Sequence, residues 1–482
     1  MGRLQWSNLL CEKRQRMSTT RKEPDANSGI NFVTRNEFEA DYDRIVGSSS
    51  VRRLQDKAQV FPLQKNDVVR TRLTHSIEVS AIARSLAKTV GLELEKRNEF
   101  QREDTEKLMG MLQTAGLIHD LGNPPFGHYG ETAIRKWYQD KFFPNSRNMS
   151  EQDADNNFVG ERTQEETDFL YFDGNVQNLR IVTKLQTMND QYGVNFTYGT
   201  LAAIIKYPYA SKNTVDDKKK FGYFKSEEDI VRKIWNETGL DEGVRHPATY
   251  LLEAADDIVY LCDDIEDGVK KGYIPWEKEY GAIKRIFGKT EKYKKIFESI
   301  EKNQPDPALK DEEKIIARVR LFRNYVQGYL MWTAIKTFFD EYDVIMNGHF
   351  GLRDLLEPDL DFVEALKKIT GKYCFACEEV LTLEVVGERV IKELLDIFYD
   401  AVAITDRKKI ETAKFYEGKI YHLISDNYKF IAGYDYNKGE RRTFENITEY
   451  DKLHLIVDFI SGMTDSYAVG LYKKLLGISL PE

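Results

Sequence analysis

The sequence lacks the features that mark disulfide-rich, membrane-spanning and nucleic-acid-coating proteins. It has four cysteines in 482 residues and a formal net charge of −9. No apolar run approaches the ~20 residues of a membrane-spanning helix. The few cysteines exclude a disulfide scaffold, and the negative charge argues against a general nucleic-acid coat but permits a local basic pocket. The opening stretch MGRLQWSNLLCEKRQRM has charges within its apolar patch and makes a poor signal peptide, so we expect a cytoplasmic protein.

The cysteines do not form an obvious metal site. Two of them lie in CFAC, residues 374–377, a spacing that both metal and redox sites use. No second Cys/His pair lies near it in the sequence. We therefore interpret Cys374 and Cys377 as half-buried thiols in a reducing compartment.

Proline is scarce, at 12 residues, and stretches rich in Leu, Ile, Lys and Glu recur, which favours helices. Apolar residues follow helical spacing in four long stretches: 69–90, 249–269, 311–339 and 378–402. The fold class is therefore predicted to be mostly α.

Alternation typical of strands is rare. GKIYHLI (418–424) and YKFIAGYD (428–435) have turn-like neighbours and predict at most a short β-hairpin. Two polar stretches, 141–165 and 208–227, read as loop-like inserts. The predicted division is an N-terminal segment (1–30), a catalytic core (31–300) and a C-terminal helical region packed on that core (301–482).

Histidine is also rare, and two of the seven lie in GLIHDLGNPPFGHYGE, from Gly116 to Glu131. His119 and Asp120 end an apolar helix, where an unpaired carboxylate would be costly to bury. The glycines and prolines that follow forbid a continued helix and predict a rigid turn. Such rigidity is useful at an active site.

A metal site would explain this stretch together with His75 and Asp256. The four side chains of His75, His119, Asp120 and Asp256 come from three predicted helices, and such groups can surround one divalent ion in a helical bundle. Each histidine alone is more often packed or exposed without a ligand, but the set favours a metal.

Acidic residues recur along the helix that carries Asp256. Glu253, Asp256, Asp263 or Asp264, and Asp267 follow three- and four-residue spacing, with Tyr260 among them. For Asp263 to Asp267 we interpret the pattern as a solvated helix face. Asp256, between two alanines and a Val-Tyr step, is predicted to point inward as a ligand.

Several stretches together resemble the HD-domain deoxynucleoside triphosphate triphosphohydrolases, the bacterial dGTPase family. The resemblance runs from Arg52 to Ala468 and implies an HD-domain helical bundle. The stretches that carry it are RRLQDKAQVFPL (52–63), RTRLTHS (70–76), LIHDLGNPPFGHYGE (117–131), FDGNVQNLRI (172–181), KYP (206–208), YLLEAADDIVYLCDDIED (250–267) and DFISGMTDSYA (458–468).

The resemblance implies roles for individual residues. The metal ligands match His75, His119, Asp120 and Asp256, and the catalytic pair matches His128 and Glu131. Gln59 matches a contact to the deoxyribose. The remaining matches are Asn175, Lys206, Tyr207 and Tyr260 around the triphosphate and sugar, and Phe375 and Glu384 in a stretch that closes over the base. The family's further basic contacts correspond to the stretch 405–424, without a residue-by-residue match.

The family converts a dNTP into a deoxynucleoside and tripolyphosphate, so water attacks the α-phosphorus. The metal would polarise an α-phosphate oxygen and lower the pKa of a bound water. His128 would transfer a proton as base or acid, and Glu131 would orient it. Lys206 and Arg72 would balance the triphosphate charge, although Arg72 could instead form a structural ion pair. Gln59 with Tyr260 would exclude a 2′-hydroxyl.

Cofactor, partners and alternatives follow from the same resemblance. We expect Mn²⁺ or Mg²⁺, with Fe²⁺, Zn²⁺ or Ni²⁺ as other candidates, and a dNTP substrate with dGTP favoured. A homo-oligomer is expected, a hexamer rather than a tetramer, with a nucleotide or single-stranded DNA as candidate effector and no membrane partner. One alternative is another HD-domain nucleotide phosphohydrolase or phosphodiesterase. The other is a non-catalytic nucleotide- or single-strand-binding regulator.

Overall fold

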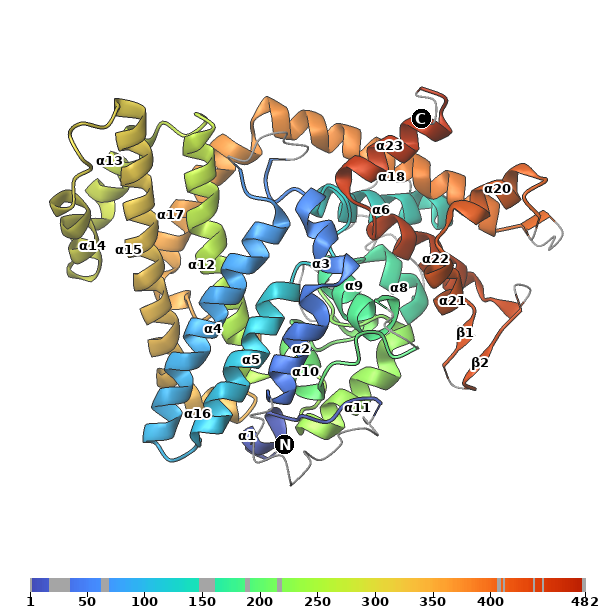
Figure 1. The fold of residues 1–482 in the computed structure, drawn as a ribbon, viewed down its shortest axis with the longest axis horizontal. Coiled ribbons are helices and arrows are strands. Elements are labelled where there is room, and N and C mark those ends of the chain that lie inside the picture. Colours follow the sequence, from blue (N-terminus) through green and yellow to red (C-terminus); the bar gives the residue numbers. More distant parts are fainter. Residues whose placement is uncertain are drawn as a thin grey trace, which may run out of the picture.

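The computed structural model describes residues 2–16, 35–61, 69–146, 161–186, 191–214, 219–404, 409–410, 412–436, 438–443 and 446–478. Within these ranges the regular structure is helical except for one two-stranded antiparallel sheet (Figure 1). The predicted mostly-α fold class is confirmed.

The α-helices of the N-terminal two thirds include the long helices that carry the histidines and acidic residues discussed above. They are α1 (Trp6–Leu9), α2 (Glu37–Val46), α3 (Ser49–Arg53), α4 (Arg72–Lys96), α5 (Arg102–Ile118), α6 (His128–Phe142), α8 (Gln164–Leu170), α9 (Gly174–Arg180), α10 (Tyr198–Ile204), α11 (Glu228–Thr238), α12 (Pro247–Lys270), α13 (Trp276–Phe287) and α14 (Glu291–Lys302).

The remaining elements complete the chain. The C-terminal α-helices and strands are α15 (Asp311–Asp340), α16 (Tyr342–Met346), α17 (Leu360–Thr370), α18 (Glu378–Val402), α20 (Tyr416–Leu423), α21 (Asp426–Ala432), β1 (Tyr434–Asp435), β2 (Glu440–Arg441), α22 (Glu449–Ser461) and α23 (Asp465–Leu475). Short 3₁₀-helices are η1 (Leu54–Asp56), η2 (Pro144–Ser146), η4 (Ser211–Asn213), η5 (Lys225–Glu227) and η6 (Glu357–Asp359), and π-helical turns are η3 (Ile181–Leu185) and η7 (Gly371–Phe375).

The position of the hairpin was predicted wrongly. Most of 418–424 and 428–435 forms α20 and α21, and the strands β1 and β2 follow them, with Tyr434 opposite Arg441. Ile420, Ile424, Tyr428 and Ile431 are buried. Ile420 of α20 and Tyr428 and Ile431 of α21 give each short helix a buried side, and this packing outweighed the local alternation.

Only part of the predicted polar inserts is described. Residues 147–160 and 215–218 lie outside the described ranges. In the remainder of 208–227, Phe221 and Phe224 are fully buried, so this stretch contributes to the core as well as to the surface. The predicted division at residue 300 stays a prediction.

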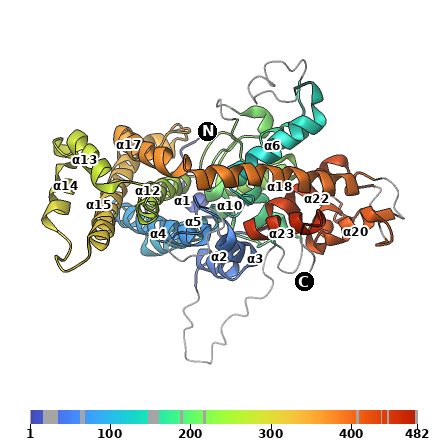
Figure 2. The ribbon, with the colours of Figure 1, turned by 90° about the horizontal axis from the view of Figure 1, so that it is seen from above.

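The helices α4, α5 and α12 lie side by side at the centre of the molecule, with α15 along one side (Figure 1). Helices α13 and α14 lie at one end, and α20 at the other (Figure 2). The long helix α18 runs between these ends beside α6. This arrangement brings the predicted metal residues of three helices to the middle of the fold.

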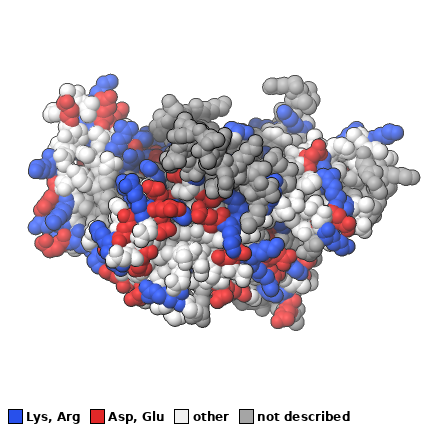
Figure 3. All heavy atoms as spheres, turned by 60° about the horizontal axis from the view of Figure 1, so that its bottom comes forward, with Lys and Arg blue, Asp and Glu red and all other residues white. Residues whose placement is uncertain are grey.

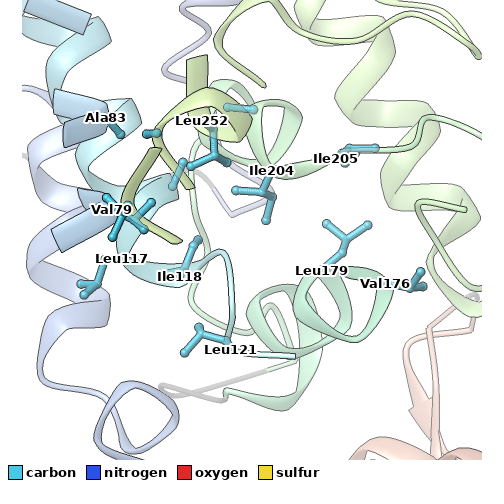
Figure 4. Close-up of a cluster of buried hydrophobic side chains, with 14 of the residues drawn as sticks. Val79, Ala83, Leu117, Ile118, Leu121, Val176, Leu179, Ile204, Ile205 and Leu252 are labelled. Carbon is cyan, nitrogen blue, oxygen red and sulfur yellow. The ribbon is translucent and has the colours of Figure 1, made fainter. Parts of the chain in front are cut away.

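A buried apolar cluster supports the ends of these helices (Figure 4). Val79 of α4, Leu117 and Ile118 of α5 and Leu252 of α12 are at most 7% exposed. Full burial of each such side chain contributes about 1.5–3 kcal/mol. Because Leu117 and Ile118 directly precede His119, the histidine lies at a firmly packed helix end.

The acidic residues that follow Asp256 are not a solvated face. Asp263, Glu266 and Asp267 are buried, and Arg70 lies 3.1 Å from Asp263 and 2.7 Å from Asp267. Arg323 of α15 lies 2.7 Å from Glu266. The prediction failed because these arginines come from elements distant in sequence, and paired carboxylates can be buried.

The described helices include none that is long and apolar enough to cross a membrane. On the face shown in Figure 3, acidic and basic side chains are interspersed, and no single basic surface dominates it. This agrees with the formal net charge of −9.

Candidate metal centre and active site

His119 caps the C-terminal end of α5, and its orientation is fixed by the backbone. Its Nδ1 lies 2.8 Å from the carbonyl oxygen of Gly116. Because a carbonyl oxygen only accepts, Nδ1 carries a hydrogen and Nε2 is left for a proton or a metal ion. Nε2 is buried and has no hydrogen-bond partner among the described residues.

His75 and Asp256 meet His119 from the neighbouring helices α4 and α12. Asp256 Oδ1 lies 3.1 Å from His75 Nε2 and 3.4 Å from His119 Nε2. Two ligand atoms that each lie ~2.1 Å from one metal ion are separated by about 3.0–3.5 Å at octahedral or tetrahedral angles. Asp256 Oδ1 therefore already has the spacing of a neighbouring metal ligand to each of the two imidazole nitrogens.

Asp120 completes the group. Ligand atoms of His75, His119 and Asp120 all lie within 4.8 Å of one another. Both carboxylate oxygens of Asp120 are anchored: Oδ2 accepts from Arg72 Nη1 at 2.6 Å, and Oδ1 from Asn123 Nδ2 at 2.6 Å. These bonds orient the carboxylate as partners of metal ligands usually do.

The electrostatics of the group fit a divalent cation. Burial would lower the pKa of His119, but Asp120 and Asp256 outweigh it and raise that pKa to about 9. Burial would also raise the pKa of Asp120, but Arg72 and His119 lower it to about 2. Two carboxylates that attract a proton to Nε2 attract a metal ion to the same point. The orphaned Nε2 and the mixed N/O donors therefore fit Mn²⁺, Mg²⁺, Fe²⁺ or Zn²⁺.

A second titratable pair begins α6. His128 Nδ1 lies 3.1 Å from Glu131 Oε2, and Glu131 Oε1 accepts from the backbone N–H of Gly174 at 2.8 Å. Glu131 is buried, whereas the side chain of His128 is 79% exposed. The hydrogen bond to Glu131 raises the pKa of His128. Glu131, itself held by Gly174, therefore orients the exposed imidazole of His128.

Arg72 connects the two groups. It bonds to Asp120, and its Nη2 lies 2.5 Å from the point where a Cβ on Gly127 would stand. Gly127 directly precedes His128 and has φ +60°, a conformation that favours glycine. The structural ion pair considered for Arg72 is therefore present, and it lies between the predicted metal residues and the start of α6.

Gly122→Ala is expected to destabilise the protein by about 3 kcal/mol. An added Cβ would lie 1.9 Å from the carbonyl oxygen of Gly174 and 2.3 Å from the backbone nitrogen of Asn178, so backbone must move. Gly281→Ala, in the middle of α13 with nothing within 4 Å, is the matched control and should be neutral or slightly stabilising. Urea unfolding of both variants measures the difference, and equal stability would contradict the packing described here.

Two more predicted residues lie beside the metal group. Asn175 and Lys206 line a cavity of about 20 Å³ together with His119 and Asp256. That volume holds a water or an ion and no nucleotide. Lys206 lies 3.2 Å from Glu253, so the lysine is paired in this structure.

The side chains of the other predicted substrate contacts form no hydrogen bond with the metal group among the described residues. The guanidinium of Arg245 lies 5.6 Å from the ring centre of Tyr207. Tyr260 and Phe375 are partly buried and packed on the core. Tyr129, next to His128, donates a hydrogen bond to Glu384 of α18. Burial, and to a smaller extent this hydrogen bond, raises the pKa of Tyr129 to about 12. No contact in the described ranges joins Tyr207 or Phe375 to the metal group.

Several buried polar atoms without a hydrogen-bond partner in the described chain lie on these site residues. They are Gln59 Oε1, Arg72 Nε, His119 Nε2, Asp264 Oδ2 and Glu384 Oε1. An unsatisfied buried polar group costs free energy unless a ligand completes it. Four of these five atoms lie on predicted site residues.

Sequence reasoning missed the role of Asn123 and the burial of Asp264. Asn123, in the turn LGNPP, anchors Asp120, and the signal was its position three residues after that aspartate. Asp264 lies eight residues after Asp256 and four after Tyr260, so all three share one side of α12. That spacing was visible in the sequence but was interpreted as a solvated face.

Comparison with known proteins agrees with this geometry. Residues 72–161, which contain three of the four predicted metal ligands, match the HD domain family. The chain is 39% identical to a deoxyguanosinetriphosphate triphosphohydrolase-like protein of Listeria monocytogenes, over 99% of this chain and 100% of the relative. It is 32% identical to a deoxyguanosinetriphosphate triphosphohydrolase of Enterobacter sp., over 92% of this chain and 94% of the relative.

A helical bundle with this histidine and aspartate group is thus an HD-domain hydrolase, and the HD domain implies a divalent metal. The chain belongs to the deoxyguanosinetriphosphate triphosphohydrolase family.

Proposed function

We propose that the protein hydrolyses dNTPs, dGTP foremost, to a deoxynucleoside and tripolyphosphate, with water attacking the α-phosphorus. The observation that carries the proposal is the convergence of the His75, His119, Asp120 and Asp256 side chains, with the buried His119 Nε2 lying 3.4 Å from Asp256 Oδ1. A plain nucleotide-binding protein has no need of such a group.

His75, His119, Asp120 and Asp256 would hold the metal, with Mn²⁺ or Mg²⁺ favoured over Fe²⁺, Zn²⁺ or Ni²⁺. When bound, the ion supplies positive charge beside the α-phosphate and acidifies water there. Arg72 holds Asp120 in its ionised form, since it contributes to the low pKa of that carboxyl. Asp120 is therefore ionised at neutral pH, and a metal ion that binds His119 displaces the proton that the two carboxylates hold there.

His128 is the proposed proton-transfer residue. Its Nδ1 is engaged by Glu131, which leaves Nε2 of an exposed side chain for the reacting oxygen. It serves as base toward water or as acid toward the leaving 5′-oxygen. Glu131 cannot swing away, because Gly174 N–H binds its other oxygen.

Cationic and polar side chains around the cavity suit a triphosphate. Lys206 lies 3.2 Å from Glu253, and Arg245 lies 2.6 Å from the same carboxylate, so Lys206 can exchange this partner for a phosphate oxygen. We assign Lys206, Asn175, Tyr207 and Arg72 to this part of the substrate.

The deoxyribose and base would lie further along α12. Tyr260 and Asp264 are on the same side of this helix as Asp256, and Asp264 Oδ2 and Gln59 Oε1 lack partners in the described chain. These acceptors suit a sugar hydroxyl, and a closely fitted wall at Gln59 and Tyr260 would reject a 2′-hydroxyl. Phe375 and Glu384 are assigned to the base.

A panel of dNTPs and NTPs with Mn²⁺ or Mg²⁺ tests this assignment. We expect dGTP to be hydrolysed about 10²-fold faster than GTP, because a closely fitted wall that leaves no room for the added 2′-hydroxyl discriminates by about this factor. Chromatography of the products should give deoxyguanosine and tripolyphosphate. Equal rates for dGTP and GTP would contradict the sugar assignment, and dGMP with pyrophosphate would favour another HD phosphohydrolase. The oligomeric state and any effector stay predictions.

A further inference from the structure

The turn between α5 and α6 has an unfavourable backbone conformation. Phe126 and Gly127 follow one another with φ +64° and +60°, and a non-glycine residue rarely adopts such an angle. The ring of Phe126 packs so closely on α18 that a Cβ added to Gly387 would lie 2.7 Å from it. This turn sets the direction of α6 and therefore the position of His128, the first residue of that helix.

A buried carboxylate from the far end of the chain holds this turn. Asp465 is 1% exposed. Its Oδ1 accepts from the backbone N–H of Phe126 at 2.9 Å, and its Oδ2 accepts from the backbone N–H of Ala58 at 3.0 Å. One side chain thus ties the turn before His128 to the segment that carries Gln59.

Lys57 makes a parallel connection. Its buried ammonium donates to the carbonyl oxygens of Asn123 and Ser461. The carbonyl oxygen of Lys57 accepts from the backbone N–H of Arg72 at 3.0 Å, at the start of α4. The segment bound by Asp465 is therefore also the segment that positions Arg72, the partner of Asp120.

Asp465 has no other evident task in its own helix. It is the first residue of α23, but the cap is Thr464, whose side chain accepts from the backbone N–H of Tyr467. Both carboxylate oxygens of Asp465 accept hydrogen bonds from residues outside this helix, Phe126 and Ala58. A carboxylate in the first turn is also favoured by the helix dipole, which suits its burial there.

We propose that Asp465 is a positioning residue for the reaction: it fixes the turn at Phe126 and thereby holds His128 in register with Arg72 and Asp120. It is not among the proposed metal ligands or substrate contacts. The proposal rests on the proposed function, in which His128 transfers a proton.

Asp465→Ala and Asp465→Asn test this, with Thr464→Val as the matched control. We expect Asp465→Ala to lower kcat for dGTP about 10²-fold with little change in KM or bound Mn²⁺, because small misplacements of a reacting group cost this much. Asn keeps one acceptor oxygen, so its loss should be smaller. Thr464→Val removes the cap of the same helix but leaves the turn intact, and kcat should stay near that of the unaltered protein.

Two readouts separate positioning from general destabilisation. If Asp465 acts through His128, Asp465→Ala should cause little further loss in a His128→Ala background. Hydrogen exchange of the peptide around Phe126 should be faster in Asp465→Ala and unchanged in Thr464→Val. An equal loss in both backgrounds, or unchanged exchange, overturns the proposal. If the unaltered protein hydrolyses no dNTP, the proposed function fails, while the exchange comparison still decides whether Asp465 holds the turn.

Discussion

His119→Ala is expected to remove the metal and reduce dGTP turnover by at least about 10³-fold. A bound ion contributes several kcal/mol of transition-state charge stabilisation, and a loss of about 4 kcal/mol corresponds to a rate reduction of about 10³-fold. His119 is the most specific choice, because its Nε2 has no hydrogen-bond partner in the described chain and its Nδ1 is already bound to Gly116. Its replacement therefore removes one ligand and few other contacts.

Turnover at saturating Mn²⁺ and metal content by elemental analysis measure the effect of His119→Ala. The exposed His349 offers a matched control, and His349→Ala should leave both quantities unchanged. Circular dichroism checks that both variants fold. A folded His119→Ala variant with full turnover would exclude this histidine as a ligand.

His128→Ala is expected to lower kcat by about 10²–10⁴-fold while the metal stays bound. General acid or base catalysis contributes this range. His128 shares no contact with His75, His119 or Asp256 in this structure, and its own partner is Glu131. The two histidine variants should therefore differ: one loses metal and turnover, the other turnover alone. Metal loss in His128→Ala, or an unchanged kcat, would contradict the division of roles.

The pH profile gives a further check on the same pair. Glu131 raises the pKa of His128, so Glu131→Gln should lower it. If His128 is the acid, activity is lost as pH rises through this pKa. If it is the base, activity is lost as pH falls through it. In either case Glu131→Gln should move that limb of the kcat profile to lower pH, and a limb that does not move would assign it to another group.

The sequence was most informative where local rules suffice. His119 could be placed at a helix end because the apolar run before it stops there, and Asp256 was predicted to point inward because two alanines precede it and a Val-Tyr step follows it. Gly and Pro after Asp120 predicted the rigid turn, and the structure places φ values of +64° and +60° in it.

Contacts between residues far apart in the chain could not be predicted from the sequence. Asp263 and Asp267 are buried because Arg70 reaches them from a segment nearly 200 residues earlier. Asp465 contacts Phe126 across 339 residues. The spacing of residues along the chain does not reveal such distant partners, so the acidic residues from Asp263 to Asp267 were interpreted as a solvated helix face. Likewise the buried face of α20 and α21 depends on what packs against it, which local alternation did not indicate.

Hydrolysis of dGTP in ¹⁸O-labelled water tests the central claim most directly. If water attacks the α-phosphorus and the 5′-oxygen leaves, mass spectrometry will find one ¹⁸O in tripolyphosphate and none in deoxyguanosine. Label in deoxyguanosine would mean attack at the sugar carbon. Labelled dGMP with pyrophosphate, or labelled phosphate with dGDP, would mean that a different bond is cleaved, and either result would contradict a triphosphohydrolase reaction at the His75, His119, Asp120 and Asp256 site.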